Sequence, residues 1–271
     1  MERVVHTVLE VGLEKPVKIL HITDVHLTVA NDQDTEEMKE TMQRRKELFR
    51  KEGGYPPHTP SEYFEEAIKM AEEMGALLVV TGDVCDLNNH GCKEEFHRIA
   101  DGHDMMFSPG GHETQCRYVR TIEEGAEYIR TTRPQVQAAF PEFDFDLDSR
   151  VVNGLNIVTA DNAIDYYSAA TLARFKKELE KGLPIIVFSH DPIFDRALNT
   201  WEALRPTEEL TDEERRISHE MIDLINTHPL VKATFAGHLH SLDDHFRIHE
   251  GKPAYVTPSL FKGACRLIEV R

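Results

Sequence analysis

Long hydrophobic runs are missing from this sequence of 271 residues. The longest are short, such as residues 76–80 and 184–188, whereas a membrane-spanning helix needs about 20 residues. The first 16 residues contain no apolar stretch followed by a cleavage signature, so we expect no secretory signal peptide. The sequence therefore predicts a soluble protein without a membrane span.

Basic residues are scarce as well. The chain has 31 Lys and Arg residues against 48 Asp and Glu residues, which gives a formal net charge of −17. Proteins that wrap nucleic acid need Lys and Arg to release counterions from the phosphates, and anionic membranes attract basic segments. We therefore expect no wrapping of nucleic acid and no binding to a membrane surface.

Cysteine is limited to four residues, namely Cys85, Cys92, Cys116 and Cys265. Their spacing matches neither a structural zinc site nor a disulfide framework. Free thiols are typical of a reducing compartment, so the sequence predicts a cytoplasmic location.

Short β-branched segments alternate with amphipathic helices along most of the chain. Capping boxes at Thr59–Glu62 and Thr211–Glu214, and a cap at Ser168, predict three helix starts. A fourth helix is expected before Gly53, and the chain becomes rich in strands from about residue 231. The expected strands are residues 4–11, 18–23, 77–81, 105–108, 155–160, 185–189 and 231–236. We expect the first of these strands to pair with the second. This alternation predicts a layered α/β fold.

No stretch of the chain has the composition of a linker, so we expect a single domain over residues 1–271. Two long excursions interrupt the alternation, a helical insertion at about 29–75 and a second segment at 113–150. Insertions of this kind usually lie over strand ends and shape a site.

Asp and His residues follow five of the expected strands. In parallel α/β sheets, side chains at the carboxyl ends of different strands can converge although they lie far apart in the sequence. Nitrogen and oxygen ligands without thiolate favour Mn, Fe, Zn or a similar divalent ion over a structural zinc. The residues concerned are Asp24 and His26, Asp83 and Asp86, His112 and Glu113, His190 and Asp191, and His238 and His240.

In order, these residues form the motifs D-x-H, G-D-x-x-D, G-x-H-E, a lone histidine and G-H-x-H. From about residue 17 to 240, the pattern resembles the calcineurin-like metallophosphoesterases. The resemblance implies an α/β fold of two facing β-sheets flanked by helices, a four-layer α/β/β/α sandwich. It also implies a metal site at the carboxyl-terminal ends of the strands.

The resemblance further implies the role of each motif residue. Asp24, His26 and His240 would bind the first of two divalent metal ions, and His190 and His238 the second. Asp83 would bridge the two ions, while His112 would act near the leaving group, oriented by Asp86. The implied reaction is hydrolysis of a phosphoric ester by hydroxide held at the metal site, on small phosphorylated substrates.

The third motif departs from the family pattern at Gly111, where the family has asparagine as a ligand of the second metal. Glycine has no side chain to coordinate an ion. The replacement ligand could be a water molecule or Asn88, Asn89 or His90, and the second ion could also bind weakly or be absent. A different class of function therefore stays open, a scaffold or interaction protein with little or no activity.

Substrate choice is expected to come from the inserted segments 29–75 and 87–107 and from the stretch after His112. Tyr118 and Trp201 could line the substrate cleft, although packing explains both more simply. The sequence predicts neither the ester type nor the oligomeric state.

Overall fold

A computed structural model describes residues 1–114, 116, 118–119, 126–163, 166–193, 210–241, 247–248 and 252–271; Trp201 lies outside these ranges. Its strands form two sheets. In spatial order, the first has five strands, β1 (Arg3–Leu9), β11 (Ala264–Val270), β2 (Val17–Ile22), β3 (Leu77–Thr81) and β4 (Met105–Ser108). The second has six, β5 (Leu147–Val152), β6 (Leu155–Ala160), β7 (Ile185–Phe188), β8 (Val231–Ala236), β10 (Lys252–Val256) and β9 (Arg247–Ile248).

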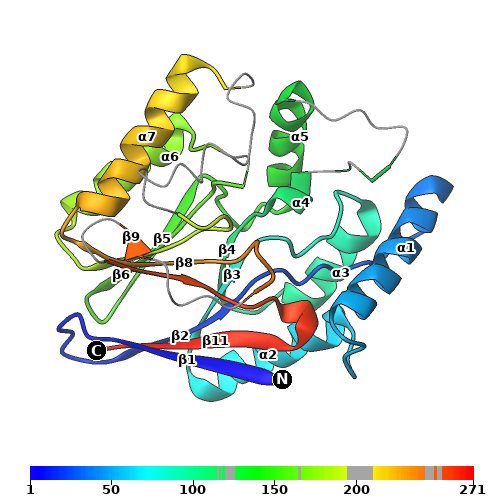
Figure 1. Cartoon of the computed structure of the whole chain (residues 1–271), viewed down its shortest axis with the longest axis horizontal. Helices are drawn as coiled ribbons and strands as arrows, with labels where there is room; N and C mark the ends of the chain where they lie inside the picture. The colour runs from blue at the N-terminus through cyan, green and yellow to red at the C-terminus, as the bar shows by residue number, and fades with distance from the viewer. Residues whose placement is uncertain are drawn as a thin grey trace.

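Helices cover the outer faces of both sheets (Figure 1). On the first sheet lie α1 (Glu36–Glu52), α2 (Pro60–Met74) and α3 (His90–Ala100), and on the second α6 (Ala169–Glu180) and α7 (Asp212–Thr227). The short α4 (Gly111–Thr114), α5 (Ala126–Ala139) and the 3₁₀ turn η4 (Leu260–Lys262) complete the described helices. None of the helices in this part of the chain combines the length and hydropathy needed to cross a membrane.

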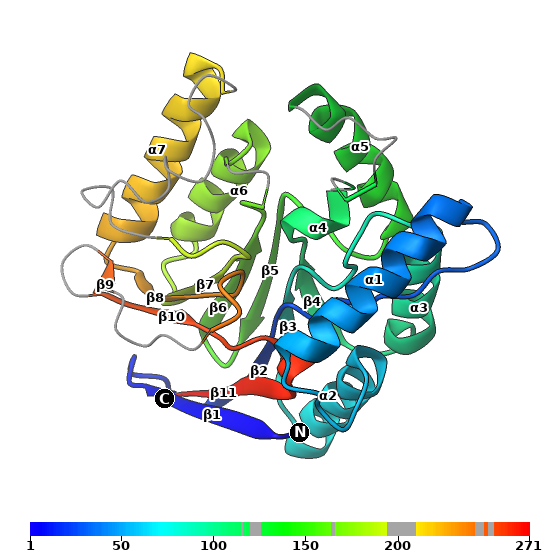
Figure 2. The same ribbon diagram turned by 45° about the vertical axis from the view of Figure 1, so that its right-hand side comes forward.

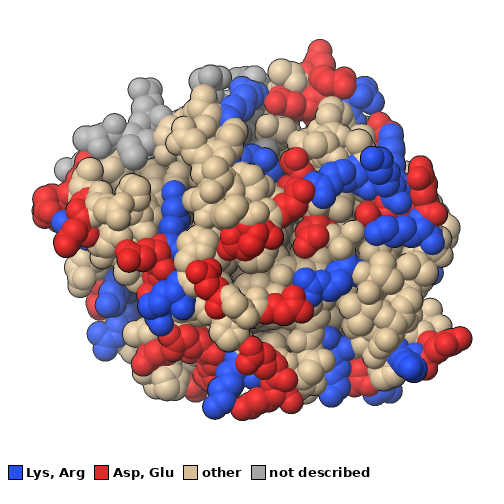
Figure 3. All heavy atoms as spheres, turned by 180° about the vertical axis from the view of Figure 1, so that it is seen from behind, with Lys and Arg blue, Asp and Glu red and all other residues tan. Residues whose placement is uncertain are grey.

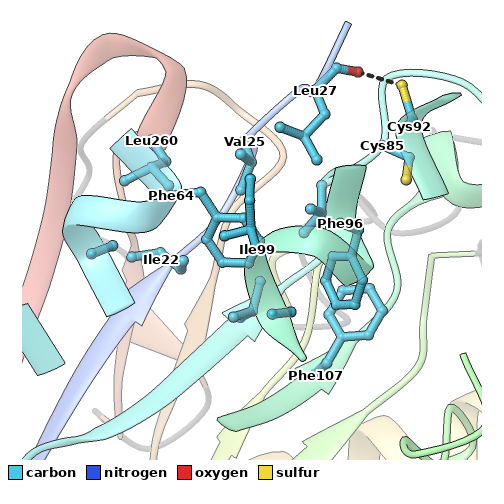
Figure 4. Packing of buried hydrophobic residues seen from close by; sticks show 14 of the residues in the cluster. Ile22, Val25, Leu27, Phe64, Cys85, Cys92, Phe96, Ile99, Phe107 and Leu260 are labelled. Carbon is cyan, nitrogen blue, oxygen red and sulfur yellow. Dashed lines mark hydrogen bonds between the residues drawn. The ribbon is translucent and has the colours of Figure 1, made fainter. Parts of the chain in front are cut away.

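Three buried clusters confirm the predicted four-layer sandwich. Ile19 and Val79 from the first sheet pack between the sheets against Ile157 and Phe188 from the second. Figure 4 shows the outer cluster of the first sheet, where residues of β2 and β4 pack against α2 and α3. The third cluster joins the second sheet to α6 and α7. Burying strands on both faces explains their continuous apolar runs.

The pairing of the first strand differs from the sequence prediction. β1 pairs in parallel with β11, and β11 pairs antiparallel with β2, so β1 and β2 are not neighbours. β11 is buried along most of its length, whereas β1 alternates between exposed and buried residues. The more apolar strand takes the inner position because it gains more from burial on both faces. The prediction that residues 4–11 pair with 18–23 was therefore wrong.

The capping boxes correctly marked the starts of α2 and α7, and Thr35 and Ser168 cap α1 and α6. Strand β5 was missed within the second excursion. It forms a hairpin with β6 through Asn153 and Gly154, both at positive φ, a typical tight hairpin turn. That the whole chain forms one domain, with an insertion at 29–75, stays a prediction.

Candidate metal centre

The loops after β2 and β3 run side by side and are held together by their backbones. The amide of Asp24 donates to the carbonyl of Gly82 at 3.0 Å, and the amide of His26 donates to that of Asp83 at 2.8 Å. A further bond from Leu27 to Val84 continues the pairing at 2.7 Å. Asp24 and His26 are thereby set opposite Asp83 by main-chain geometry alone.

The second sheet reaches the same place through the loop after β8. The backbone amide of His238 donates to Asp24 Oδ2 at 3.0 Å. A Cβ at Gly237 would lie 1.8 Å from Thr23 Oγ1 and 2.6 Å from Asp24 Oδ2. Only glycine lets the two loops approach this closely.

All six residues predicted to bind metal come together in two groups that share Asp83. Ligand atoms within each group lie within 4.8 Å of one another. His190 Nε2 is 3.2 Å and His26 Nε2 is 3.9 Å from Asp83 Oδ2. The first group is Asp24, His26, Asp83 and His240, and the second is Asp83, His190 and His238.

The outward ring nitrogen of each histidine in these groups faces an oxygen. A carboxylate or carbonyl at Nδ1 favours the tautomer with the proton there and keeps Nε2 available as a ligand. Nε2 of His26, His190 and His240 points into the cluster. The Nδ1 contacts are His26 with Asp86 at 3.0 Å, His190 with the Thr81 carbonyl at 2.9 Å, His240 with Glu52 at 3.0 Å and His238 with Asp191 at 3.3 Å.

Two further observations fit these residues to divalent cations. Asp24 Oδ1 and His190 Nε2 are buried without a hydrogen-bond partner among the described residues, and a bound cation would satisfy both. Seven non-glycine residues of the described chain have positive φ, and five belong to the cluster: Asp24, His26, Asp83, His238 and His240. Such strain collects at functional sites, where the surrounding structure holds it in place.

The protonation states of two of these residues, Asp83 and His238, suit metal binding. Burial works against ionisation of Asp83, but the imidazoles of His190, His112 and His26 hold its pKa well below the ordinary value. Burial, with His190 nearby, lowers the pKa of His238 to about 4. Asp83 is therefore ionised at neutral pH and His238 is neutral.

His112 lies beside the shared carboxylate, with its side chain 12% exposed. Its Nδ1 is 2.6 Å from the Asp86 carbonyl oxygen and 3.2 Å from Asp86 Oδ1, and its Nε2 is 3.9 Å from Asp83 Oδ2. Burial opposes its charged form, but Asp83 and Asp86 outweigh burial and raise the pKa of His112 to about 9. Asp86 contacts both His112 and His26.

Several residues that support the site had no predicted role. The buried carboxylate of Glu113 accepts four backbone N–H bonds, from Gly110 and from residues 83–85, and so clamps the loop after β3. The Asn162 side chain pairs with both the amide and the carbonyl of Asp191. Arg45 and Glu52 of α1 contact Asp86 and His240. Glu113 was noticeable next to His112, whereas the other three lie far in sequence from the residues they hold.

Gly111 begins α4 and does not have a positive φ. The second group has three ligand residues against four in the first, in keeping with a missing side chain. Of the alternatives, the Asn89 side chain and the His90 amide bind Asp34. Asn88 and Asn89 each keep a buried Oδ1 without a hydrogen-bond partner in the described structure.

A sequence profile of calcineurin-like phosphoesterases matches residues 17–242. The chain belongs to this family. Membership confirms the predicted family and its enzyme class, the metallophosphoesterases. The family is metal-dependent, and the two ligand groups give this member candidate sites.

Solved structures with a similar backbone fold share little sequence identity with this chain. A Staphylococcus aureus protein provisionally named a 5′-nucleotidase, in complex with alpha-ketoglutarate, aligns with 91% of this chain at 12% identity and a TM-score of 0.46. The chain spans 49% of that protein, about half its length. Phosphopantetheinyl hydrolase from Mycobacterium tuberculosis aligns over 95% of this chain and 91% of its own, at 12% identity and a TM-score of 0.43. No curated protein matches the chain.

Proposed function

We propose that this phosphoesterase hydrolyses small phosphorylated compounds at a site for two divalent cations, with Asp83 as the shared ligand. The observation that carries the proposal is the convergence of two ligand groups on one carboxylate. Asp24, His26 and His240 would complete the first site, and His190 and His238 the second. Bound cations would supply an activated water molecule and offset the charge of the reacting phosphoryl group.

His112 serves as the proton donor in this proposal. Its Nδ1 donates to oxygens of Asp86, so the charged imidazolium carries a second proton on Nε2, which it can donate to the oxygen of the leaving alcohol. The backbone amide of His112 donates to Asp83 Oδ1 at 3.0 Å, which fixes the backbone of His112 beside the shared carboxylate. Donation to the leaving oxygen would assist the departure of poor leaving groups most strongly.

Charge favours a small substrate over a long polyanion. The chain carries a net charge of −17, and on the face shown in Figure 3 Lys and Arg are interspersed with Asp and Glu. Two bound cations would reverse the field only close to the site. The four cysteines are free and buried, which supports the proposed cytoplasmic location.

The test is metal analysis of protein purified without chelator, followed by assays on aryl phosphate monoesters and diesters with added Mn²⁺, Fe²⁺ or Zn²⁺. We expect about two ions per chain and turnover that chelator abolishes and metal restores. Asp83→Asn should lose both ions together, because it removes the shared charge. Absence of turnover with every metal and ester would favour the scaffold alternative, which rests on Gly111.

A further inference from the structure

Helix α1 presents three side chains to the metal centre from one face. Arg45, Phe49 and Glu52 follow a spacing of four and three residues, which places them along one side of a helix. In Figure 2, the carboxyl-terminal end of α1 lies beside the η4 turn, where the rings of Phe49 and Phe261 are 4.9 Å apart. The face that carries these three residues therefore points toward the site.

Arg45 binds the carboxylate of Asp86, which contacts both His26 and His112. Its Nε and Nη2 donate to Asp86 at 2.7 and 2.8 Å. The guanidinium carbon lies 4.7 Å from the centre of the Phe49 ring and 4.0 Å from the centre of the Tyr118 ring. The two-point bond fixes the orientation of Asp86.

The other two residues contact candidate ligands directly. The Phe49 ring stacks on the His26 ring at 4.1 Å with an angle of 21° between the planes. Glu52 Oε1 lies 3.0 Å from His240 Nδ1, and Lys262 Nζ lies 3.4 Å from the same oxygen. His26 and His240 both belong to the first ligand group, so α1 contacts one cation site and not the other.

We propose that α1 is a positioning helix for the first cation site and, through Arg45 and Asp86, for His112. The inserted segment 29–75 then does more than select substrate, because the site is incomplete without its side chains. Arg45, Phe49 and Glu52 are positioning residues, which act through Asp86, His26 and His240. The part that concerns His112 rests on the proposed function, whereas the geometry of the histidines does not.

Calorimetric titration of the metal-free full chain with Mn²⁺ tests the cation part. Glu52→Ala should weaken one of the two ions by about 10-fold, the lower end of the effect of losing such a partner, and leave the other within 2-fold. Glu47→Ala, an exposed glutamate on the same helix, is the matched control and should leave both unchanged. Equal affinities of Glu52→Ala and the unmodified chain for both ions would overturn the role of Glu52.

Arg45→Lys keeps the positive charge but cannot form the two-point hydrogen bond to Asp86. Arg44 is exposed on the same helix, and Arg44→Lys is the matched control. We expect Arg45→Lys to weaken the same ion as Glu52→Ala and to lower kcat more than it changes KM. If Arg45→Lys does not fold, Phe49→Leu replaces it, since loss of the stacked ring should weaken the same ion. Weaker binding of the other ion, or an equal loss of affinity for both ions, would overturn the proposal.

Imidazole ¹⁵N spectra of the metal-free chain separate this inference from the proposed function. His26 and His240 should both carry a proton at Nδ1, and the fraction of His240 protonated at Nδ1 should fall in Glu52→Ala. Unchanged spectra would refute positioning by α1 even in an active enzyme. Changed spectra in a chain without turnover would uphold positioning and refute the function.

Discussion

At the scale of single residues, the site is built from side chains held in unusual ways. Five cluster residues have positive φ, and Asp24 and Asp83 stay ionised although buried because imidazoles surround them. Such a group of charges and strained backbones is costly without a ligand and is stabilised when cations bind. Gly111 is the position at which this chain departs from the family motif, and His112 is a position at which it matches the motif.

Gly111→Asn should tighten the second cation site by restoring an oxygen ligand. Gly111 does not have a positive φ, so asparagine meets no left-handed strain there. We expect the weaker ion to bind more tightly by about 10-fold, with higher turnover at limiting metal, on the scale of one ligand partner. Metal titration followed by activity measures both. If the affinity for the second ion is unchanged in a folded variant, Asn88 or Asn89 already supplies the oxygen, and Asn88→Ala or Asn89→Ala should then weaken binding of that ion.

His112→Ala should slow phenyl esters far more than nitrophenyl esters, because only a poor leaving group needs a proton. In the unmodified chain, kcat/KM should fall on the alkaline side as His112 loses its proton. The carboxylates set the pKa of His112 to about 9, and bound cations would offset them and move this fall to lower pH. The alkaline fall should vanish in the variant. Equal losses on both esters would leave His112 an electrostatic role only.

At the scale of elements, the loops at the ends of neighbouring strands hold one another. Backbone bonds join the loops after β2 and β3, and a side chain joins those after β6 and β7. Asn162 Nδ2 donates to the Asp191 carbonyl at 2.8 Å, and the Asp191 amide donates to Asn162 Oδ1 at 3.0 Å. Asp191 follows His190 and contacts His238. Asn162 therefore supports the two candidate ligands that belong only to the second group, His190 and His238.

Asn162→Ala should therefore weaken the second ion and spare the first. The variant removes the acceptor of the buried Asp191 amide, which costs about 1–3 kcal/mol of stability, whereas the Asp191 carbonyl keeps its hydrogen bond from Ser189 Oγ at 3.0 Å. Urea unfolding of the metal-free chain measures this loss, and Mn²⁺ titration measures the two affinities. Asn153→Ala, an exposed turn residue, is the comparison for metal binding. Weakening of the first ion instead would contradict this assignment.

At the scale of the whole molecule, a histidine is buried between the two sheets. His21 of β2 is bonded by Thr81 and Thr257, each at 2.8 Å, and packs on Phe188 of the second sheet. Burial, with the buried Arg266 nearby, lowers the pKa of His21 to about 3. The folded protein therefore keeps His21 neutral under mildly acidic conditions, where the unfolded chain protonates it.

This difference in pKa between the folded and unfolded states makes the free energy of unfolding depend on pH. Above pH 6.5, His21 is neutral in both states and does not alter stability. As pH falls from 6.5 towards 3, only the unfolded state takes up this proton, so stability drops by up to about 1.4 kcal/mol per pH unit. Urea unfolding of the metal-free chain between pH 7 and 4.5 measures the slope. His21→Gln should lower the slope by one proton, whereas His6→Gln on an exposed position of β1 should not.

The sequence by itself determined which residues end the strands and start the helices. Asp24, Asp83, His190 and His238 each follow a buried strand, and the caps at Thr59 and Thr211 lie where α2 and α7 begin. These features could be predicted because they are local: a strand end or a capping box depends on residues a few positions apart. The order of the motifs then indicated the family, and with it the sandwich.

Only the tertiary structure decided how distant segments meet. β11 separates β1 from β2, Arg45 bonds Asp86 across 41 positions, and Glu52 bonds His240 across 188. No periodicity or spacing marks such pairs, because contacts between elements depend on how the layers pack and not on neighbouring residues. The chain's own sequence thus specified the ligands of the candidate metal centre, while packing of α1 and of the strand-end loops selected the side chains that hold them.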